Sequence, residues 1–188
     1  MFENDSDIDP SKIAIVSGVS KGYAMTGFRV GWTRTSPFVA AQMTKIQEPL
    51  VSCATAFSQT AAAAALNGPQ QCVGDMLSQY KKRRDLAMSI LKARGRPSAY
   101  TPGGAFYLPV DVSTSGMSSR DFALKLLSDK HCAVAPGIAF NTSEGPPSGD
   151  NLAILDSFVR VSLANSDENV GKGMHLLCDM LDELEAKA

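Results

Sequence analysis

The segment from Gly18 to Trp32, GVSKGYAMTGFRVGW, concentrates the residues that could do chemistry. Lys21 directly follows a β-branched run, and Arg29 comes after a stretch of mostly small residues. An amine that forms an imine with an aldehyde needs a partly desolvated pocket, where burial and nearby positive charge lower its pKa. A guanidinium can bind two phosphate oxygens at once. A Ser-Lys pair alone would instead indicate an ordinary surface lysine in a glycine-rich turn.

A second charged residue, Arg160, stands in the otherwise apolar run FVRVSLA. An unpaired charge is expensive to bury, so an inward-facing arginine there needs an anion, and a carboxylate fits its fork of donors best. The alternation of a strand could equally point Arg160 to solvent, opposite Val159 and Val161. The residues by themselves favour neither of these two interpretations over the other.

Four stretches together resemble the class I aminotransferases, in the fold-type I superfamily that uses pyridoxal phosphate. Gly18-Val19-Ser20-Lys21, followed by Ala24-Met25, Gly27 and Arg29-Val30-Gly31, is similar to the lysine signature of that family. The other stretches resemble further family segments in the same order along the chain, and they are Pro102 to Tyr107, Val134 to Phe140 and Arg160 to Ala164.

The resemblance implies roles for three residues. Lys21 would bind the cofactor as an imine and act as the acid/base, Arg29 would bind the cofactor phosphate, and Arg160 would bind the substrate carboxylate. The implied reaction is amino-group transfer between an amino acid and a 2-oxo acid, in a homodimer. The acidic start MFENDSDIDP is unlike a signal peptide, so a cytoplasmic location is expected. Carbon–sulfur lyases and cyclopropane-forming synthases share these motifs. A non-catalytic remnant with a structural or association role is the alternative from a different class.

The same resemblance implies a C-terminal half, since family subunits are about twice this long. The expected fold class is α/β, with part of a large-domain sheet, a long interdomain helix and an α+β small domain. The aspartate at the ring nitrogen and the stacking aromatic residue would lie upstream, so the chain alone is expected to be inactive. The family often has a phosphate-binding serine where this chain has Gly18, so Ser17 or Ser20 is a possible substitute.

Tyr23, Trp32 and three residues of the PLVSCAT turn could also line the cofactor pocket. The three are Ser52, Cys53 and Thr55. Residues of these types more often pack in the core or in a loop.

The elements that would position these residues follow from periodicity. Strands are expected over 12–18, buried on both faces, and over 28–34. Helices are expected from Ser36 until Pro49 interrupts, over 56–66, and as one long helix between Pro69 and Arg94. A strand over 105–112, a capped helix over 118–130, strands over 132–140 and 157–164, and a final helix capped by Asn165 or Ser166 complete the pattern. The expected domains are 1–90, which retains part of the cofactor-binding domain, and 91–188.

Composition excludes several classes of protein. With 188 residues, 44% hydrophobic, and a net charge of -1, the chain has no electrostatic footprint for nucleic acid and no apolar run long enough for a membrane span. The basic run Lys81 to Arg84 is interpreted as a solvated helix face rather than a phosphate patch. The four cysteines lack the pairing of a metal site and are expected to be free and mostly buried thiols, with no metal bound.

Overall fold

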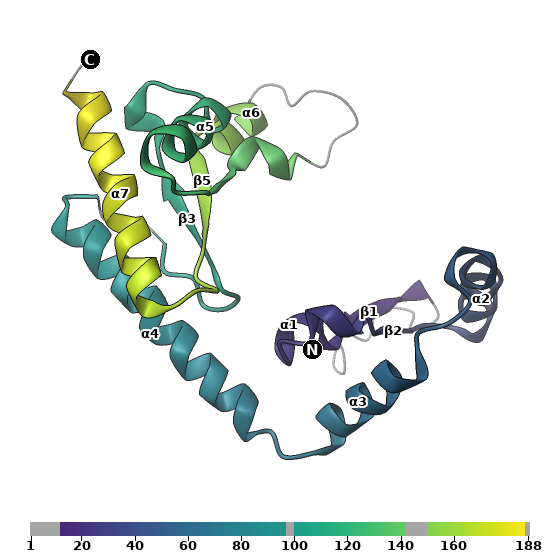
Figure 1. The fold of residues 1–188 in the computed structure, drawn as a ribbon. Helices are drawn as coiled ribbons and strands as arrows, with labels where there is room; N and C mark the ends of the chain where they lie inside the picture. Colours follow the sequence, from purple (N-terminus) through teal and green to yellow (C-terminus); the bar gives the residue numbers. More distant parts are fainter. Residues whose placement is uncertain (1–11, 97–99, 142–149, 187–188) are drawn as a thin grey trace. The chain divides into compact units, whose positions relative to one another are not determined.

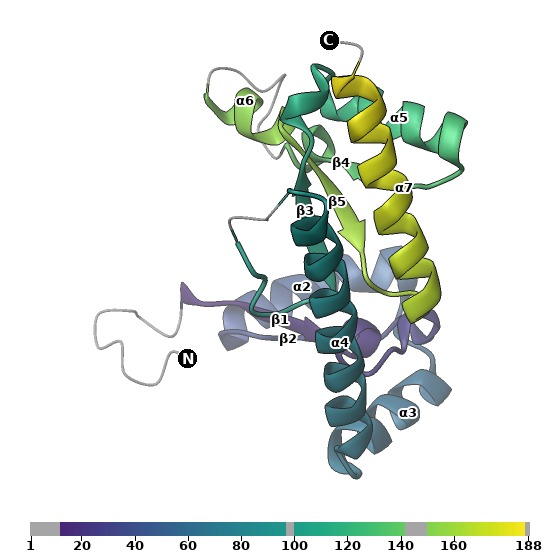
Figure 2. The same ribbon diagram turned by 90° about the vertical axis from the view of Figure 1, so that its left-hand side faces the viewer.

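The computed structural model describes residues 12–96, 100–141 and 150–186, and the chain divides into two compact units, Met1–Met76 and Leu77–Ala188. Figures 1 and 2 show the elements of each unit. The first unit contains β1 (Ile15–Gly18), α1 (Val19–Gly22), η2 (Thr26–Phe28), β2 (Gly31–Arg34), α2 (Pro37–Val51), α3 (Ala56–Asn67) and the start of α4 (Gln71–Ala93). The second contains the rest of α4, β3 (Tyr107–Asp111), η3 (Ser113–Ser115), α5 (Ser119–Lys130), β4 (Ala135–Pro136), η4 (Gly137–Phe140), α6 (Asp150–Asp156), β5 (Phe158–Ser162) and α7 (Asp167–Glu185).

The two strands of the first unit form an antiparallel pair, in register from Ile15 opposite Arg34 to Gly18 opposite Gly31. Both expected strands are present but shorter than predicted. The expectation that the first is buried on both faces is wrong for this chain, because Val16 is 75% exposed and Ile15 is 42% exposed. Within the described residues β2 is the single strand paired with β1, so the other edge of β1 has no neighbouring strand.

Helix α2 begins as its sequence predicts. The Ser36 side chain accepts a hydrogen bond from the backbone N–H of Val39 at 3.4 Å, and Pro37 occupies the first turn, where its missing N–H costs nothing. The predicted interruption at Pro49 is wrong, since the helix continues to Val51. One lost hydrogen bond so near the end does not stop it, and the chain turns at Ser52, whose φ is 56°.

The long helix α4 confirms the predicted 3.6-residue pattern and ends before Gly95, which has a φ of +69°. The structural division falls within this helix, between Met76 and Leu77, earlier than the expected domain limit at residue 90. The reason is packing. Ala87, Ile90 and Leu91 are buried in the core of the second unit, so most of the helix belongs to that unit.

The sheet of the second unit has the order β3-β5-β4, and both pairings are antiparallel. The prediction of a strand over 132–140 is largely wrong. Only Ala135 and Pro136 pair with β5 before the chain turns into η4. A Cβ on Gly137 would lie 2.1 Å from the carbonyl oxygen of Leu155, so backbone from α6 occupies the space beside it. Helix α6 was not predicted, and the loop before it lies outside the described residues.

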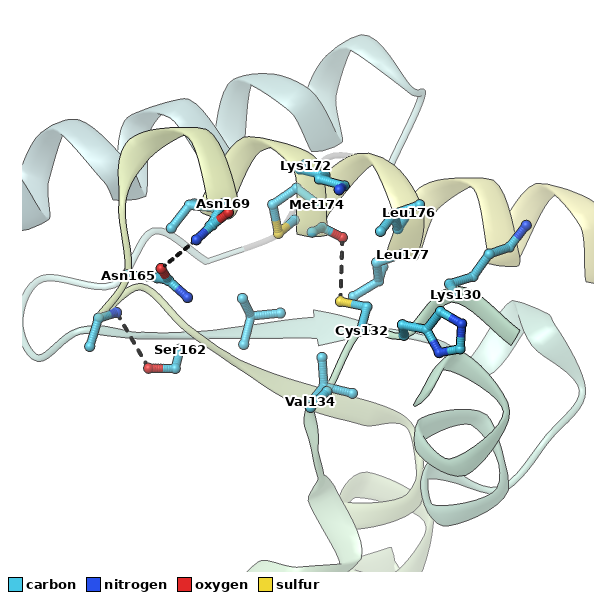
Figure 3. Close-up of a pocket in the computed structure, with 16 residues that line it drawn as sticks. Lys130, Cys132, Val134, Ser162, Asn165, Asn169, Lys172, Met174, Leu176 and Leu177 are labelled. Atoms are coloured by element: carbon cyan, nitrogen blue, oxygen red, sulfur yellow. Dashed lines mark hydrogen bonds between the residues drawn. The ribbon is translucent and has the colours of Figure 1, made fainter. Parts of the chain in front are cut away.

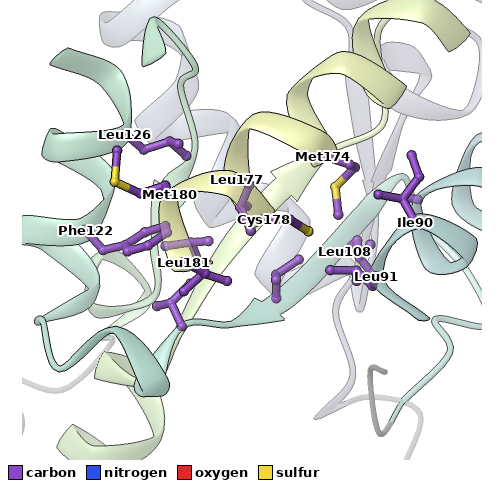
Figure 4. Close-up of a cluster of buried hydrophobic side chains, with 14 of the residues drawn as sticks. Ile90, Leu91, Leu108, Phe122, Leu126, Met174, Leu177, Cys178, Met180 and Leu181 are labelled. Atoms are coloured by element: carbon purple, nitrogen blue, oxygen red, sulfur yellow. The ribbon is translucent and has the colours of Figure 1, made fainter. Parts of the chain in front are cut away.

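The core of the second unit lies between one face of this sheet and helices α4, α5 and α7 (Figure 4). Leu108, Val159, Phe122, Leu177 and Leu181 are among its fully buried side chains. Each such aliphatic or aromatic side chain contributes about 1.5–3 kcal/mol on burial. Caps position the covering helices, as predicted: the Ser118 hydroxyl accepts from Asp121 N at 3.0 Å, and the Ser166 hydroxyl accepts from Asn169 N at 3.1 Å.

Candidate functional site

Lys21 lies in the single turn of helix α1, which starts as soon as β1 ends. Val19 anchors this turn: its side chain is fully buried, and its backbone N–H donates to the carbonyl of Val30 at 3.4 Å. The N–H of Tyr23 in turn donates to the carbonyl of Val19 at 3.2 Å. Lys21 itself is exposed in this chain, so the partly desolvated pocket expected around its amine is not formed by the described residues alone.

Glycines at 18 and 31 allow β1 and β2 to approach closely where the lysine turn begins. A Cβ on Gly18 would lie 3.0 Å from the carbonyl oxygen of Val30 and 3.2 Å from the Cα of Gly31. A serine side chain there would therefore have to displace backbone. Of the two possible substitutes, Ser17 is exposed and Ser20 is half-buried. Their contact with a phosphate stays a prediction.

Arg29 has a left-handed backbone conformation, with a φ of 53° and a ψ of 45°, and closes the 3-10 turn η2. That conformation costs a non-glycine residue about 1–2 kcal/mol. The Nη1 of Arg29 donates to the carbonyl of Thr26 at 3.0 Å, which ties the exposed side chain to its own turn. Lys21 and Arg29 thus lie on the same β1–β2 connection, and an anion or aldehyde ligand could approach both from solvent.

The weaker candidates have structural contacts or open positions. The Tyr23 hydroxyl donates to Oε1 of Gln70 at 2.9 Å, and the Thr55 hydroxyl donates to the hydroxyl of Ser58 at 2.8 Å. Trp32 is 40% exposed, and Ser52 forms the turn after α2. Tyr23 and Thr55 therefore have partners within their own unit that explain their placement.

Arg160 lies in the second unit, on the face of the sheet that points away from the core. In the β3–β5 register Pro109 stands opposite Arg160 and Tyr107 opposite Ser162, while the alternating partners Leu108 and Val110 are buried. Because side chains alternate between faces along a strand, Arg160 and Tyr107 share the face opposite to the hydrophobic core.

Two aromatic rings lie against the guanidinium of Arg160. Its Cζ is 4.1 Å from the ring centre of Tyr107 and 4.7 Å from that of Phe140. Its Nε is buried and has no hydrogen-bond partner among the described residues. The sequence left open whether Arg160 points inward to an anion or outward to solvent. In the structure it is half-buried against aromatic rings, on the face away from the core, which is neither of these arrangements in full. The sequence pattern did not predict these contacts, although both aromatic residues stand in the stretches that resemble the family.

The second unit also has a hollow of about 510 Å³ between α7, the chain at 130–134 and the end of β5 (Figure 3). Asn165, Asn169 and Lys172 line it, together with apolar side chains such as Val134 and Leu177. The side chains that line this hollow do not include Lys21, Arg29 or Arg160. The hollow is therefore separate from the predicted site residues.

The basic run lies on α4, where Lys81 and Lys82 are exposed as expected and Arg83 and Arg84 are half-buried. Lys82 and Arg83 form ion pairs with Asp167 at 2.6 and 2.9 Å, which the sequence did not predict.

The expectation of mostly buried thiols is wrong. The four cysteines are free, but Cys53 and Cys72 are exposed rather than buried. Cys53 lies in the turn after α2 and Cys72 in the first turn of α4, and both positions are exposed.

Within the parts of the chain that the structure describes, no three His, Cys, Asp or Glu side chains group as metal ligands would. The helices of these same parts are too short or too polar to cross a bilayer.

Comparison with known proteins gives consistent matches. The family described as "Aminotransferase class I and II" matches residues 3–175. An aspartate aminotransferase of Musicola paradisiaca is 34% identical over 172 residues, which are 91% of this chain and 40% of that protein. A probable aspartate/prephenate aminotransferase of Rickettsia conorii is 37% identical, over 93% of this chain and 43% of that protein.

Solved structures agree with these relatives. The aromatic aminotransferase from Pyrococcus horikoshii superposes with a TM-score of 0.81 at 31% identity, covering 94% of this chain and 44% of that one. The aspartate aminotransferase from Thermotoga maritima gives 0.76 at 31% identity, covering 92% and 40%. The chain therefore spans less than half the length of the proteins it matches, and its fold is part of the fold-type I architecture expected from its sequence.

Proposed function

The chain belongs to the class I and II aminotransferase family, and on that basis we propose that it supplies the cofactor lysine and two anion-binding arginines of a pyridoxal-phosphate-dependent aminotransferase. One observation carries the proposal: the matched range, 3–175, includes Lys21, Arg29 and Arg160. The substrates would be an amino acid and a 2-oxo acid, and the enzyme a cytoplasmic homodimer. Free thiols are consistent with a reducing compartment.

The side chains present suit the cofactor. Lys21, an exposed residue of α1, carries an amine of the kind that reacts with an aldehyde, and the Arg29 guanidinium on the same connection can bind a phosphate. When bound, the cofactor supplies an electron sink for the substrate α-carbon. Lys21 would then move the proton at that carbon, and Arg160 would hold the substrate carboxylate through its nitrogen edge.

The proposal is tested by adding pyridoxal phosphate to the full chain, reducing with borohydride and mapping the modified lysine by mass spectrometry. We expect the phosphopyridoxyl group at Lys21, with lower labelling elsewhere. Lys45, also exposed and in the same unit, gives the matched control: Lys45→Ala should leave the yield unchanged, whereas Lys21→Ala should abolish the main product. Equal labelling of both lysines would contradict the role of Lys21.

Arg29 is tested by the same reaction with two aldehydes. Because its proposed partner is the phosphate, Arg29→Gln should reduce the yield with pyridoxal phosphate and leave the yield with pyridoxal, which lacks the phosphate, unchanged. An equal loss with both aldehydes would show that Arg29 acts through the shape of the turn instead.

A further inference from the structure

We infer that Tyr107 and Phe140 are positioning residues for Arg160, which fix the direction in which its guanidinium presents hydrogen-bond donors to a carboxylate. The inference rests on the proposed function, since it takes Arg160 as the carboxylate-binding residue. It adds two residues on other elements, β3 and η4, that decide the geometry of that binding.

The first step is the contact itself. A guanidinium donates hydrogen bonds only in its own plane, from its five N–H groups. Rings at 4.1 and 4.7 Å from Cζ attract the cation through their π-electrons and exclude water from the space they occupy. The Nε of Arg160 is buried and has no partner in the described part of the chain, so a carboxylate that arrives from solvent would accept hydrogen bonds from the Nη groups in the plane of the guanidinium.

The second step is that each ring is itself held in place. Tyr107 is flanked by Phe106, with ring centres 4.5 Å apart and planes inclined by 48°. Phe140 stacks on Phe158, with centres 6.4 Å apart and planes within 12° of parallel. Phe158 lies two residues before Arg160 on the same strand, so the strand that carries the arginine also carries the support of its second ring.

The third step concerns the position of η4, which carries Phe140. The backbone N–H of Ile138 donates to the hydroxyl of Ser119 at 3.3 Å, and that hydroxyl donates to Oδ1 of Asp156 at 2.9 Å. Ser119 is fully buried, and its N–H also donates to Asp156 at 2.7 Å. Together with the close approach at Gly137, these bonds join α5, the end of α6 and η4. The ring of Phe140 is therefore placed by the fold and not by a free loop.

The consequence is a lower entropic cost of binding, because an arginine that is already oriented loses less freedom when it accepts a ligand. Removing either ring should weaken carboxylate binding about three- to tenfold, in line with the modest strength of single cation–π contacts. Phe140→Tyr should keep the contact, since a tyrosine ring offers the same face.

The experiment uses the full chain with 15N-labelled arginine and follows the Nε–H signal of Arg160, identified by its loss in Arg160→Lys. The probe is sodium acetate, titrated against sodium chloride at equal ionic strength. In the wild type the Arg160 signal should be shifted by ring currents and should respond saturably to acetate. In Phe140→Leu and Tyr107→Leu the ring-current shift should decrease and the dissociation constant rise, whereas Phe140→Tyr should resemble the wild type. Phe57→Leu, an exposed aromatic residue of the first unit, is the matched control and should change neither readout.

The outcomes separate the two claims. A saturable response with the same dissociation constant in wild type and in Phe140→Leu would overturn the positioning role and leave the carboxylate role of Arg160 intact. An Arg160 signal that does not respond to acetate in the wild type would overturn the carboxylate role, and with it the proposed function. Ser119→Ala gives an independent check, because release of η4 should decrease the ring-current shift from Phe140 while the contact with Tyr107 stays. An unchanged shift in Ser119→Ala, with an unfolding transition showing the chain to be folded, would overturn the third step.

Discussion

Gly31 approaches the carbonyl of Ser17 so closely that a Cβ at this position would lie 2.8 Å from the carbonyl oxygen. Backbone atoms on both sides of this contact belong to the strand pair that carries the Lys21 turn and Arg29. The space between the strands, rather than any property of the lysine turn itself, therefore requires glycine here.

Gly31→Ala should separate β1 from β2 and destabilise the first unit by about 1–3 kcal/mol, the usual cost of overpacking. Hydrogen exchange of the amides in these two strands should become faster, as measured by mass spectrometry. Gly27→Ala is the control, because nothing lies within 4 Å of a Cβ at that position. Equal protection in the two variants would show that the close contact is relieved without cost.

Asp182 links the ends of α4 and α7 through Arg94 and Arg96, and hydrogen bonds from these two arginines lower the pKa of its carboxyl group from the ordinary 3.8. A carboxyl group whose pKa is lowered in the folded state stabilises the fold at pH values above its ordinary pKa. This contribution is lost as the pH falls from the ordinary pKa through the lowered one. Asp182→Asn should therefore destabilise the chain near neutral pH and have progressively less effect below about pH 4.

The measurement is urea unfolding of both proteins across this pH range. High salt should reduce the difference at neutral pH, since the group is largely exposed and screened. A destabilisation that is the same at pH 7 and at pH 3 would mean that the side chain acts through packing rather than through its charge.

The four thiols should react at two distinct rates. Cys53 and Cys72 are exposed, whereas burial raises the pKa of both the Cys132 and the Cys178 thiol. Because the thiolate is the reactive form, iodoacetamide should modify the first pair quickly and the second pair slowly in the folded chain. Peptide mapping at successive times measures this, and urea should remove the difference. Fast modification of Cys178 in the native chain would contradict its fully buried position.

The first unit should drive self-association of the chain. Phe38, Leu50 and Phe57 on its helices are 74%, 71% and 90% exposed, and apolar surface of this kind favours association. Phe57→Glu should shift sedimentation toward the monomer, while Leu124→Glu, on an exposed position of α5, should not. A monodisperse monomer of the unmodified chain at micromolar concentrations would refute the prediction.

The second unit should fold better as a chain that starts at Leu77 than as a chain that starts at Pro97, after the end of α4. A chain from Pro97 lacks Ala87, Ile90 and Leu91, three buried residues of the core. Loss of such side chains costs several kcal/mol, which is comparable to the whole stability of a small domain. Circular dichroism melting of the two chains measures the difference, and equal melting temperatures would show that α4 is dispensable.

The sequence by itself determined the features that depend on local chemistry. The caps at Ser36, Ser118 and Ser166, the length of α4, and the stop at Gly95 follow from residue preferences that act within a few positions. The motif around Lys21 was sufficient to indicate the family, because its residues are close together along the chain.

Tertiary structure alone decided what depends on segments distant in the chain. The strand expected over 132–140 became two paired residues and η4, since backbone from α6 lies beside Gly137. The contact of Arg160 with both Tyr107 and Phe140 required three elements that only the sheet register and the Ser119 hydrogen bonds bring together. Alternation along one strand cannot reveal a neighbour on another strand or turn, because it records the face of a residue and not what that face meets.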